Sequence, residues 1–265
     1  MRVVVDSNYL QSKKLEKYLS KSTNEVILTD QVSYEAIGSD IHKSFEILSR
    51  HSEQVFVLKR TGKIIKQSLK SSGLQKRLID EKDSKRFRTI CKKIQNPHKR
   101  DQAFLTTLKH MKHEVDADLL RINNEAAQMG ELMLDYFSSM SKGEAKELRA
   151  GPPYNDKTLS FILKRIEKLT IQLFQGVVNF KDSKYYDEFY NSYLFRSGVC
   201  GYFLAQEWYL SGGLKDVKAK KMMNDLLDVQ IAAYATYFDG FFSNDKKAIR
   251  IYKISDYFIK ETIKT

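Results

Sequence analysis

The stretch MRVVVDSNYL, residues 1–10, opens the chain with an apolar run that ends at Asp6. Branched residues such as valine favour extended backbone, so the run predicts a strand from Arg2 to Val5. Asp6, Ser7 and Asn8 are residue types that suit the turn after a strand. Because an acid stands directly behind a buried strand, we ask which other acids the chain brings to the same edge.

Strand and helix patterns alternate after this opening. A polar segment from Gln11 to Lys21 predicts a helix, EVILT (Glu25–Thr29) predicts a second strand, and QVFVLK (Gln54–Lys59) predicts a third. The segment between the second and third strands begins like a helix. This alternation is typical of an α/β protein with a parallel sheet.

Helical patterns dominate the middle of the chain, from about Ile64 to Leu210. One clear stripe of apolar residues at helical spacing consists of Leu159, Ile162, Leu163, Ile166, Leu169 and Leu173. The aromatic-rich residues 184–210 are expected to line a core or a subunit contact, and stacking on nucleic-acid bases is the alternative. After Ser211 a long helix leads to the strand-like pair Phe241-Phe242. We therefore predict a sheet domain built from residues 1–63 and 211–265, with a large all-helical insertion at 64–210.

The composition excludes several classes of protein. The chain has 265 residues, of which 42% are hydrophobic, so it can bury a core and a disordered protein is excluded. It has no apolar run long enough for a membrane span and no recognisable secretory signal. The two cysteines do not form a disulfide framework or a metal-type spacing, which favours a cytoplasmic protein with reduced thiols.

The positive charge is concentrated in one stretch. The net charge is +12, and residues 59–100 hold 15 Lys and Arg against 3 acids, so this stretch accounts for 15 − 3 = +12. It predicts either a surface for phosphate backbones or a solvated helix face. Four residues are the candidate nucleic-acid contacts: Arg86, Arg88, Lys92 and Lys93.

Four acids fall where they could meet. Asp6 follows the first strand, and in an open parallel sheet ligands bind at the carboxyl ends of the strands. Asp245 follows the Phe241-Phe242 pair, Asp228 lies on the preceding helix, and Glu35 lies early in the helix after the second strand. Asp225 is one turn before Asp228 on the same helix face. Clustered carboxylates repel one another, and Mg²⁺ or Mn²⁺ relieves the repulsion.

The same residues resemble the motifs of the PIN-domain nucleases. VVVDSNYL is similar to the first motif of that family, an apolar strand that ends in Asp and is followed by Ser or Thr and then Asn. DVQIAAYATYFDGFFSND (228–245) resembles the C-terminal motif more specifically, and VSYEA resembles the second acidic site through Glu35. The resemblance covers about the first sixty residues and the last fifty-five, and the helical middle departs from it.

The resemblance implies a metal-dependent nuclease, and among nucleases it favours an endoribonuclease. Many members of the resembling family belong to toxin and defence modules. Asp6, Glu35, Asp228 and Asp245 would be both the catalytic acids and the ligands of Mg²⁺ or Mn²⁺. Asn8 and Ser243 would orient the first and last acids by hydrogen bonding. Asp225, one turn before Asp228, is a further candidate for a supporting role beside the site. RNA is the expected partner ahead of DNA, and a second copy of the chain or a regulatory protein is a further candidate.

Three alternatives stay open at this point. A phosphatase of the haloacid dehalogenase type also begins with a strand and an Asp, but it requires a second acid where this chain has Asn8. A non-catalytic nucleic-acid-binding or interaction module could use the same scaffold. HMKHE places His110, His113 and Glu114 at helical spacing, which predicts either a polar helix face or a metal site.

Overall fold

Four short strands form one parallel sheet that joins the two ends of the chain. Their order is β3–β2–β1–β4, and every neighbouring pair is parallel. The strands are β1 Arg2–Val5, β2 Glu25–Leu28, β3 Val55–Val57 and β4 Gly240–Phe242. The prediction of an α/β protein with a parallel sheet is thus confirmed. All four strands overlap the runs from which the sequence predicted them.

The computed structural model describes residues 1–38, 40–65, 74–96, 140–174, 189–212 and 219–263, with isolated positions between 102 and 137. The first three strands are followed by helices, all of which are short except α7. They are η1 Ser7–Tyr9, α1 Lys13–Leu19, α2 Asp30–Gly38, α3 Ile41–Ser44, α4 Glu46–Arg50, η2 Ser52–Gln54, α5 Thr61–Ile65, α6 Leu74–Leu78 and α7 Glu81–Gln95.

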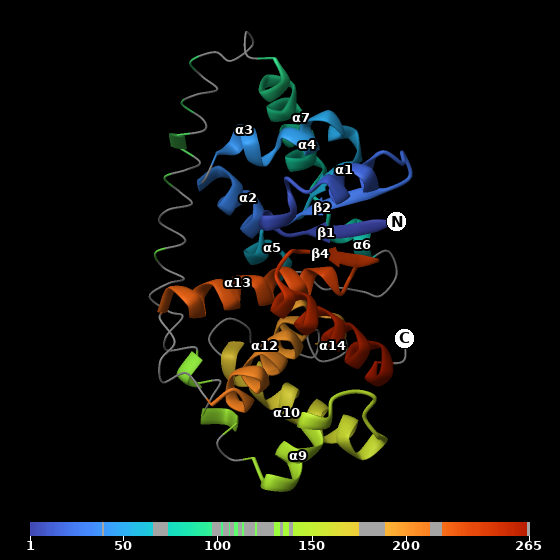
Figure 1. Ribbon diagram of the computed structural model, residues 1–265, viewed down its shortest axis with the longest axis vertical. Helices are drawn as coiled ribbons and strands as arrows, with labels where there is room; N and C mark the ends of the chain where they lie inside the picture. Colours follow the sequence, from blue (N-terminus) through green and yellow to red (C-terminus); the bar gives the residue numbers. More distant parts are fainter. Residues whose placement is uncertain are drawn as a thin grey trace.

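Longer helices build the rest of the described chain. They are α9 Lys142–Ala150, α10 Asp156–Phe174, η4 Phe189–Asn191, α12 Tyr193–Leu210, α13 Ala219–Ala235 and α14 Lys246–Thr262. In Figure 1 the sheet and α1 to α7 occupy the upper part, and α9, α10 and α12 occupy the lower part. Helix α13 lies between them, and α14 lies to the right of α12. Both termini lie on the right-hand side of that view.

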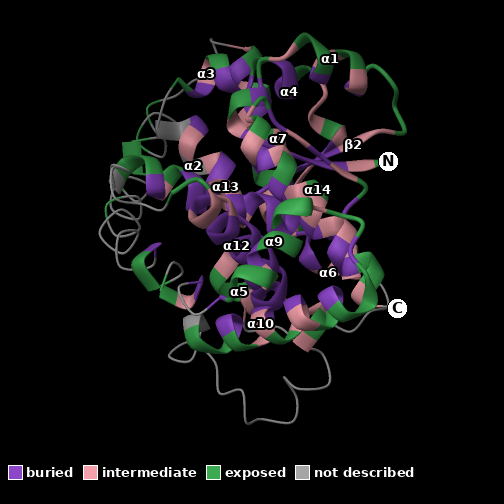
Figure 2. Cartoon of the chain, turned by 60° about the horizontal axis from the view of Figure 1, so that its bottom comes forward, coloured by how far each residue is buried: buried purple, intermediate pink, exposed green. Residues whose placement is uncertain are grey.

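Helix α12 is the central helix of the lower part. Most of its residues are buried, including Phe195, Tyr202, Phe203 and Trp208, and Figure 2 shows it as a buried ribbon surrounded by other helices. It packs against α10, α13 and α14. The aromatic residues of this segment therefore form a core, as one of the sequence interpretations predicted. The predicted apolar stripe of α10 is buried against α12 at Leu159, Ile162, Ile166 and Leu169.

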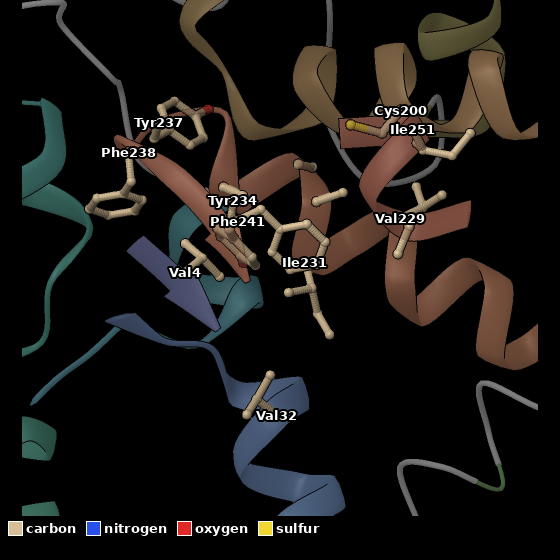
Figure 3. Packing of buried hydrophobic residues seen from close by; sticks show 14 of the residues in the cluster. Val4, Val32, Cys200, Val229, Ile231, Tyr234, Tyr237, Phe238, Phe241 and Ile251 are labelled. Carbon is tan, nitrogen blue, oxygen red and sulfur yellow. The ribbon is translucent and has the colours of Figure 1, made fainter. Parts of the chain in front are cut away.

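Helix α13 connects the sheet to the helical part. It contacts β1 and β4 on one side and α12 on the other. Its small residues Ala232 and Ala235 are fully buried, which permits this close packing. Figure 3 shows Ile231 and Tyr234 of α13 gathered near Val4 of β1 and Phe241 of β4. The sheet and the helical part consequently share one hydrophobic core.

Helix α7 falls within the predicted insertion, yet it packs against α4 and β3 of the sheet region. Its buried face consists of Ser84, Phe87, Cys91 and Ile94. The Ser84 hydroxyl accepts a 2.9 Å hydrogen bond from the amide of Val57 at the end of β3. The boundary at residue 63 between the two predicted regions stays a prediction.

No helix in the described part of the chain combines the length and apolar character that crossing a bilayer requires.

Candidate functional site

Asp6 lies at the carboxyl edge of the sheet, where the first and last strands end side by side. Val5 of β1 is paired with Phe242 of β4, so Asp6 and Ser243 leave the sheet at the same level. The amide of Asp6 donates a 2.8 Å hydrogen bond to the carbonyl of Phe242. Asp6 itself is only 2% exposed. The register of the sheet thus brings the predicted first and last motifs together.

Asn8 and Ser243 hold the Asp6 carboxylate. Oδ2 of Asp6 accepts a hydrogen bond from Nδ2 of Asn8 and another from Oγ of Ser243, both at 2.6 Å. Asn8 also fixes the loop after β4, because its Oδ1 accepts from the amide of Asn244 at 2.8 Å. These contacts place Asn8 and Ser243 where the resemblance implied residues that orient Asp6.

Glu35 reaches the same edge from α2. The hydroxyl of Ser7 donates to Oε2 of Glu35 and lies 3.5 Å from Oδ1 of Asp6. One hydroxyl therefore links the two acids. Burial raises the pKa of Glu35, and the charge of Asp6 raises it further, whereas the bond from Ser7 lowers it. The pKa of Asp6 is raised as well, first by burial, although the bond from Ser243 opposes the rise.

Asp245 caps the N-terminus of α14. Its Oδ1 accepts hydrogen bonds from the amides of Lys247 at 2.6 Å and Ala248 at 3.0 Å. Its own amide donates to Oγ of Ser243 at 2.9 Å, so the hydroxyl that holds Asp6 also fixes the start of this helix. Asp245 is thus a helix cap. It is also a neighbour of Asp6, and the negative charge of Asp245 raises the pKa of the Asp6 carboxyl.

Asp228 carries the strongest electrostatic sign of a shared site. Its pKa is raised to about 8, first by burial and then by the negative charges of Asp6, Asp245, Glu35 and Asp225, in that order. An isolated aspartate has a pKa near 4 and is ionised at neutral pH. With its pKa raised to about 8, the Asp228 carboxyl is instead largely protonated at neutral pH. All four acids predicted from the sequence are therefore within electrostatic reach of one another around Asp228.

Asp225 lies one turn before Asp228 and is buried at 5% exposure. Its Oδ2 accepts a 3.0 Å hydrogen bond from Nε1 of Trp208, and its Oδ1 forms an ion pair with Nζ of Lys247. The sequence predicted that Asp225 supports the metal-binding acids. Its partners are instead a tryptophan of the helical part and a lysine two residues after Asp245.

The donors of this site suit a hard divalent cation, because all are carboxylates and their mutual repulsion favours a bound positive charge. Their arrangement is less favourable. Within the residues that the structure describes, no three or more His, Cys, Asp or Glu side chains are grouped so that they could hold a metal ion. The acids are gathered at one edge of the sheet. For several of them to bind one ion, their carboxylate groups would have to move closer together.

The four predicted nucleic-acid contacts differ in their surroundings. Arg86 and Lys92 are exposed on α7, together with Lys82 and Lys85. Arg88 is half-buried: its Nε lies 3.3 Å from Oε2 of Glu53, and its guanidinium lies over the ring of Phe56. Lys93 is half-buried too. We call the exposed set Lys82, Lys85, Arg86 and Lys92 the α7 basic stripe.

The histidine motif stays untested, because Glu114 lies outside the described residues. Sequence reasoning also missed three residues at the site: Ser7, Lys247 and Trp208. Ser7 stands between two residues that were assigned, Lys247 follows Asp245 by two positions, and Trp208 is the sole tryptophan of the chain. No pattern in the sequence places Trp208 beside Asp225, because the contact joins two separate helices.

A second buried polar cluster lies behind the ends of β2 and β3. The Asp30 carboxylate accepts from the amide of Thr61 at 2.9 Å, and the Thr61 hydroxyl in turn accepts from Tyr234 at 2.8 Å. Nε2 of Gln31 donates to Oε1 of Gln230 at 2.9 Å. This last bond ties the helix that carries Glu35 to the helix that carries Asp228.

Comparison of the chain with protein-family models, with curated proteins and with solved structures found no match.

Proposed function

We propose that the chain is a metal-dependent nuclease that hydrolyses phosphodiester bonds, with RNA as its main substrate. One observation carries the proposal. Asp6, Glu35, Asp228 and Asp245 come from four separate elements to one edge of the sheet, and their charges together raise the pKa of Asp228 to about 8. A fold does not keep such a costly set of carboxylates together for stability, and sites of this kind are typical of function.

The four acids would hold Mg²⁺ or Mn²⁺. Lewis-acid activation of water, together with stabilisation of the charge on the phosphate, is the chemistry that such a cation supplies when bound. The protein's own residues have distinct tasks. Asn8 and Ser243 keep the Asp6 carboxylate in one orientation, and Ser7 does the same for Glu35.

Two features support a nucleic-acid substrate. The α7 basic stripe offers exposed positive charge for phosphates, and residues 59–100 carry the whole net charge of the chain. The preference for RNA over DNA rests on the resemblance to the PIN-domain nucleases. A role as a toxin or defence effector, and a regulatory protein partner, follow from the same resemblance.

The test is cleavage of labelled RNA and of single- and double-stranded DNA by the purified protein, with Mn²⁺ or with EDTA. We expect RNA to be cut only with metal, and the cleavage to vanish in Asp6→Asn and in Asp228→Asn. Glu261→Gln, an exposed acid of α14, is the matched control and retains cleavage. Cleavage that survives in EDTA, or in both site variants, would rule out the proposal.

A second candidate function is a nucleic-acid-binding module without catalysis. The observation that favours it is that no three-ligand metal group is found among the described residues. Binding of RNA that does not depend on Mn²⁺, with no cleavage and no effect of Asp6→Asn, would support this second candidate.

A further inference from the structure

We infer that Lys247 and Trp208, both acting through Asp225, position the acids Asp228 and Asp245, so that the helical part of the chain sets the geometry of the candidate site. The inference rests on the proposed function and assigns a role to the helical part. Lys247 and Trp208 are positioning residues in this scheme, since neither needs to touch the substrate.

Asp225 is the centre of the arrangement. Each of its carboxylate oxygens has a partner: Trp208 of α12 donates to Oδ2 at 3.0 Å, and Lys247 of α14 pairs with Oδ1. The Asp225 side chain is 6% exposed and that of Lys247 is 20% exposed. A charge buried to this degree is unfavourable unless it is paired, so the two partners fix Asp225 in place. Three helices, α12, α13 and α14, meet at this one carboxylate.

Lys247 contacts the acidic site in two ways. Its ammonium group pairs with Asp225, and its backbone amide donates a 2.6 Å hydrogen bond to Oδ1 of Asp245. Asp225 in turn is one helical turn from Asp228. Direct contacts of this single lysine therefore join Asp245, at the start of α14, to Asp225 of α13. In this scheme the ion pair of Lys247 fixes how α13 and the start of α14 approach each other, and with it the separation of Asp228 and Asp245.

A second ion pair connects α12 and α14 beside Trp208. Nη2 of Arg250 lies 2.5 Å from Oε1 of Glu207, the residue before Trp208. Because α12 is the buried centre of the helical part, its position is set by the packing of that part. Trp208 transmits that position to Asp225. The negative charge of Asp225 also adds to the field that raises the pKa of Asp228, so a change in its pairing alters the electrostatics of the site as well.

Trp208 provides its own reporter for the test. It is the sole tryptophan of the chain, so the tryptophan emission of the full-length protein arises from this one position. We expect titration with Mn²⁺ at pH 8 to change the emission of Trp208 and to give a matching calorimetric binding curve. Both signals should disappear in Asp228→Asn.

Three substitutions separate the roles. Lys247→Met removes the charge at similar length, Trp208→Phe removes the donor and keeps an aromatic ring, and Lys247→Arg keeps the charge. We expect the first two to weaken Mn²⁺ binding measured by calorimetry about tenfold, the usual effect of losing a residue that orients a ligand. Lys247→Arg should restore most of the affinity. Lys246→Met, an exposed neighbour with the same change of charge, is the matched control and should bind as the unaltered chain does.

The outcomes distinguish the inference from the proposed function. If Lys247→Met and Trp208→Phe bind Mn²⁺ unchanged while Asp228→Asn does not, the inference is wrong and the proposed function stands. Tighter binding by Lys247→Met would mean that Lys247 competes with the cation, which also overturns the inference. If the unaltered chain binds no Mn²⁺ and cuts nothing, both fail. Trp208→Phe leaves the ion pair intact, so it decides the question even if Lys247→Met does not fold.

Discussion

The hydroxyl of Ser243 donates a 2.6 Å hydrogen bond to the carboxylate of Asp6, although the two residues are 237 positions apart in the sequence. The contact follows from the parallel pairing of β1 and β4, which ends both strands at the same edge. The Ser243 hydroxyl also accepts from the amide of Asp245. One small side chain thus connects the first acid of the chain with the last.

Loss of this hydroxyl should weaken the site without dismantling the fold. In Ser243→Ala the Asp6 carboxylate loses one of its short hydrogen bonds, and we expect Mn²⁺ affinity to fall about tenfold and stability by about 1 kcal/mol. Ser243→Thr keeps the hydroxyl and is the matched control. Calorimetric titration and urea unfolding measure the two effects. Equal Mn²⁺ affinity in Ser243→Ala and the unaltered chain would contradict the assigned role.

The raised pKa of Asp228 predicts a stability that depends on pH. The pKa of Asp228 is about 8 in the folded state and about 4 in the unfolded state. Between about pH 4 and pH 8 the folded state therefore binds one proton more than the unfolded state. The free energy of unfolding should therefore fall as pH rises from about 4 to 8 in EDTA. Asp228→Asn is neutral at every pH, so at pH 8 it should be the more stable protein, by on the order of 2 kcal/mol.

The measurement is urea unfolding of both proteins across this range, with Glu261→Gln as a control at an exposed acid. Mn²⁺ should restore the stability of the unaltered chain at pH 8 and leave Asp228→Asn unchanged, because bound cation offsets the repulsion. Parallel pH profiles for the unaltered chain and Asp228→Asn would show that the carboxyl is not held protonated by its neighbours.

The α7 basic stripe predicts a salt-dependent contribution to RNA binding. We expect Arg86→Ala and Lys92→Ala each to weaken binding similarly for all sequences and to lower the salt dependence of the affinity. Arg88→Ala should instead lower stability by about 1 kcal/mol, because Arg88 packs on Phe56 and pairs with Glu53. Lys253→Ala on α14 is the control for an exposed charge. An unchanged salt dependence in Arg86→Ala and Lys92→Ala would place the RNA-binding surface elsewhere.

Helix α12 passes α10 at Gly198 with no room for a side chain. A Cβ atom at this position would lie 1.9 Å from Oγ1 of Thr170. We expect Gly198→Ala to lower the free energy of unfolding by roughly 1–3 kcal/mol, despite the better helix propensity of alanine. Gly62→Ala, where the new atom meets nothing within 4 Å, should be neutral or slightly stabilising. Adding Thr170→Ala should recover part of the loss; no recovery would mean that the clash with Thr170 is not the cause.

Much of the fold follows from local patterns in the sequence. The runs Arg2–Val5 and Glu25–Leu28 are strands because branched apolar residues suit a buried parallel sheet, and the stripe of α10 is buried as its spacing predicts. The packing of α7 on β3 could not be predicted this way. Its amphipathic pattern shows that one face is buried, but any apolar surface could cover that face.

The sequence by itself determined the parallel α/β class and predicted the four candidate acids, because both depend on short-range patterns of residue type. The tertiary structure alone decided which groups surround those acids. Ser7 reaches Glu35, and Trp208 and Lys247 reach Asp225, only because packing of α2, α12, α13 and α14 brings distant segments into contact. Likewise, the elevated pKa of Asp228 depends on burial and on the distances between charges, which no local pattern encodes.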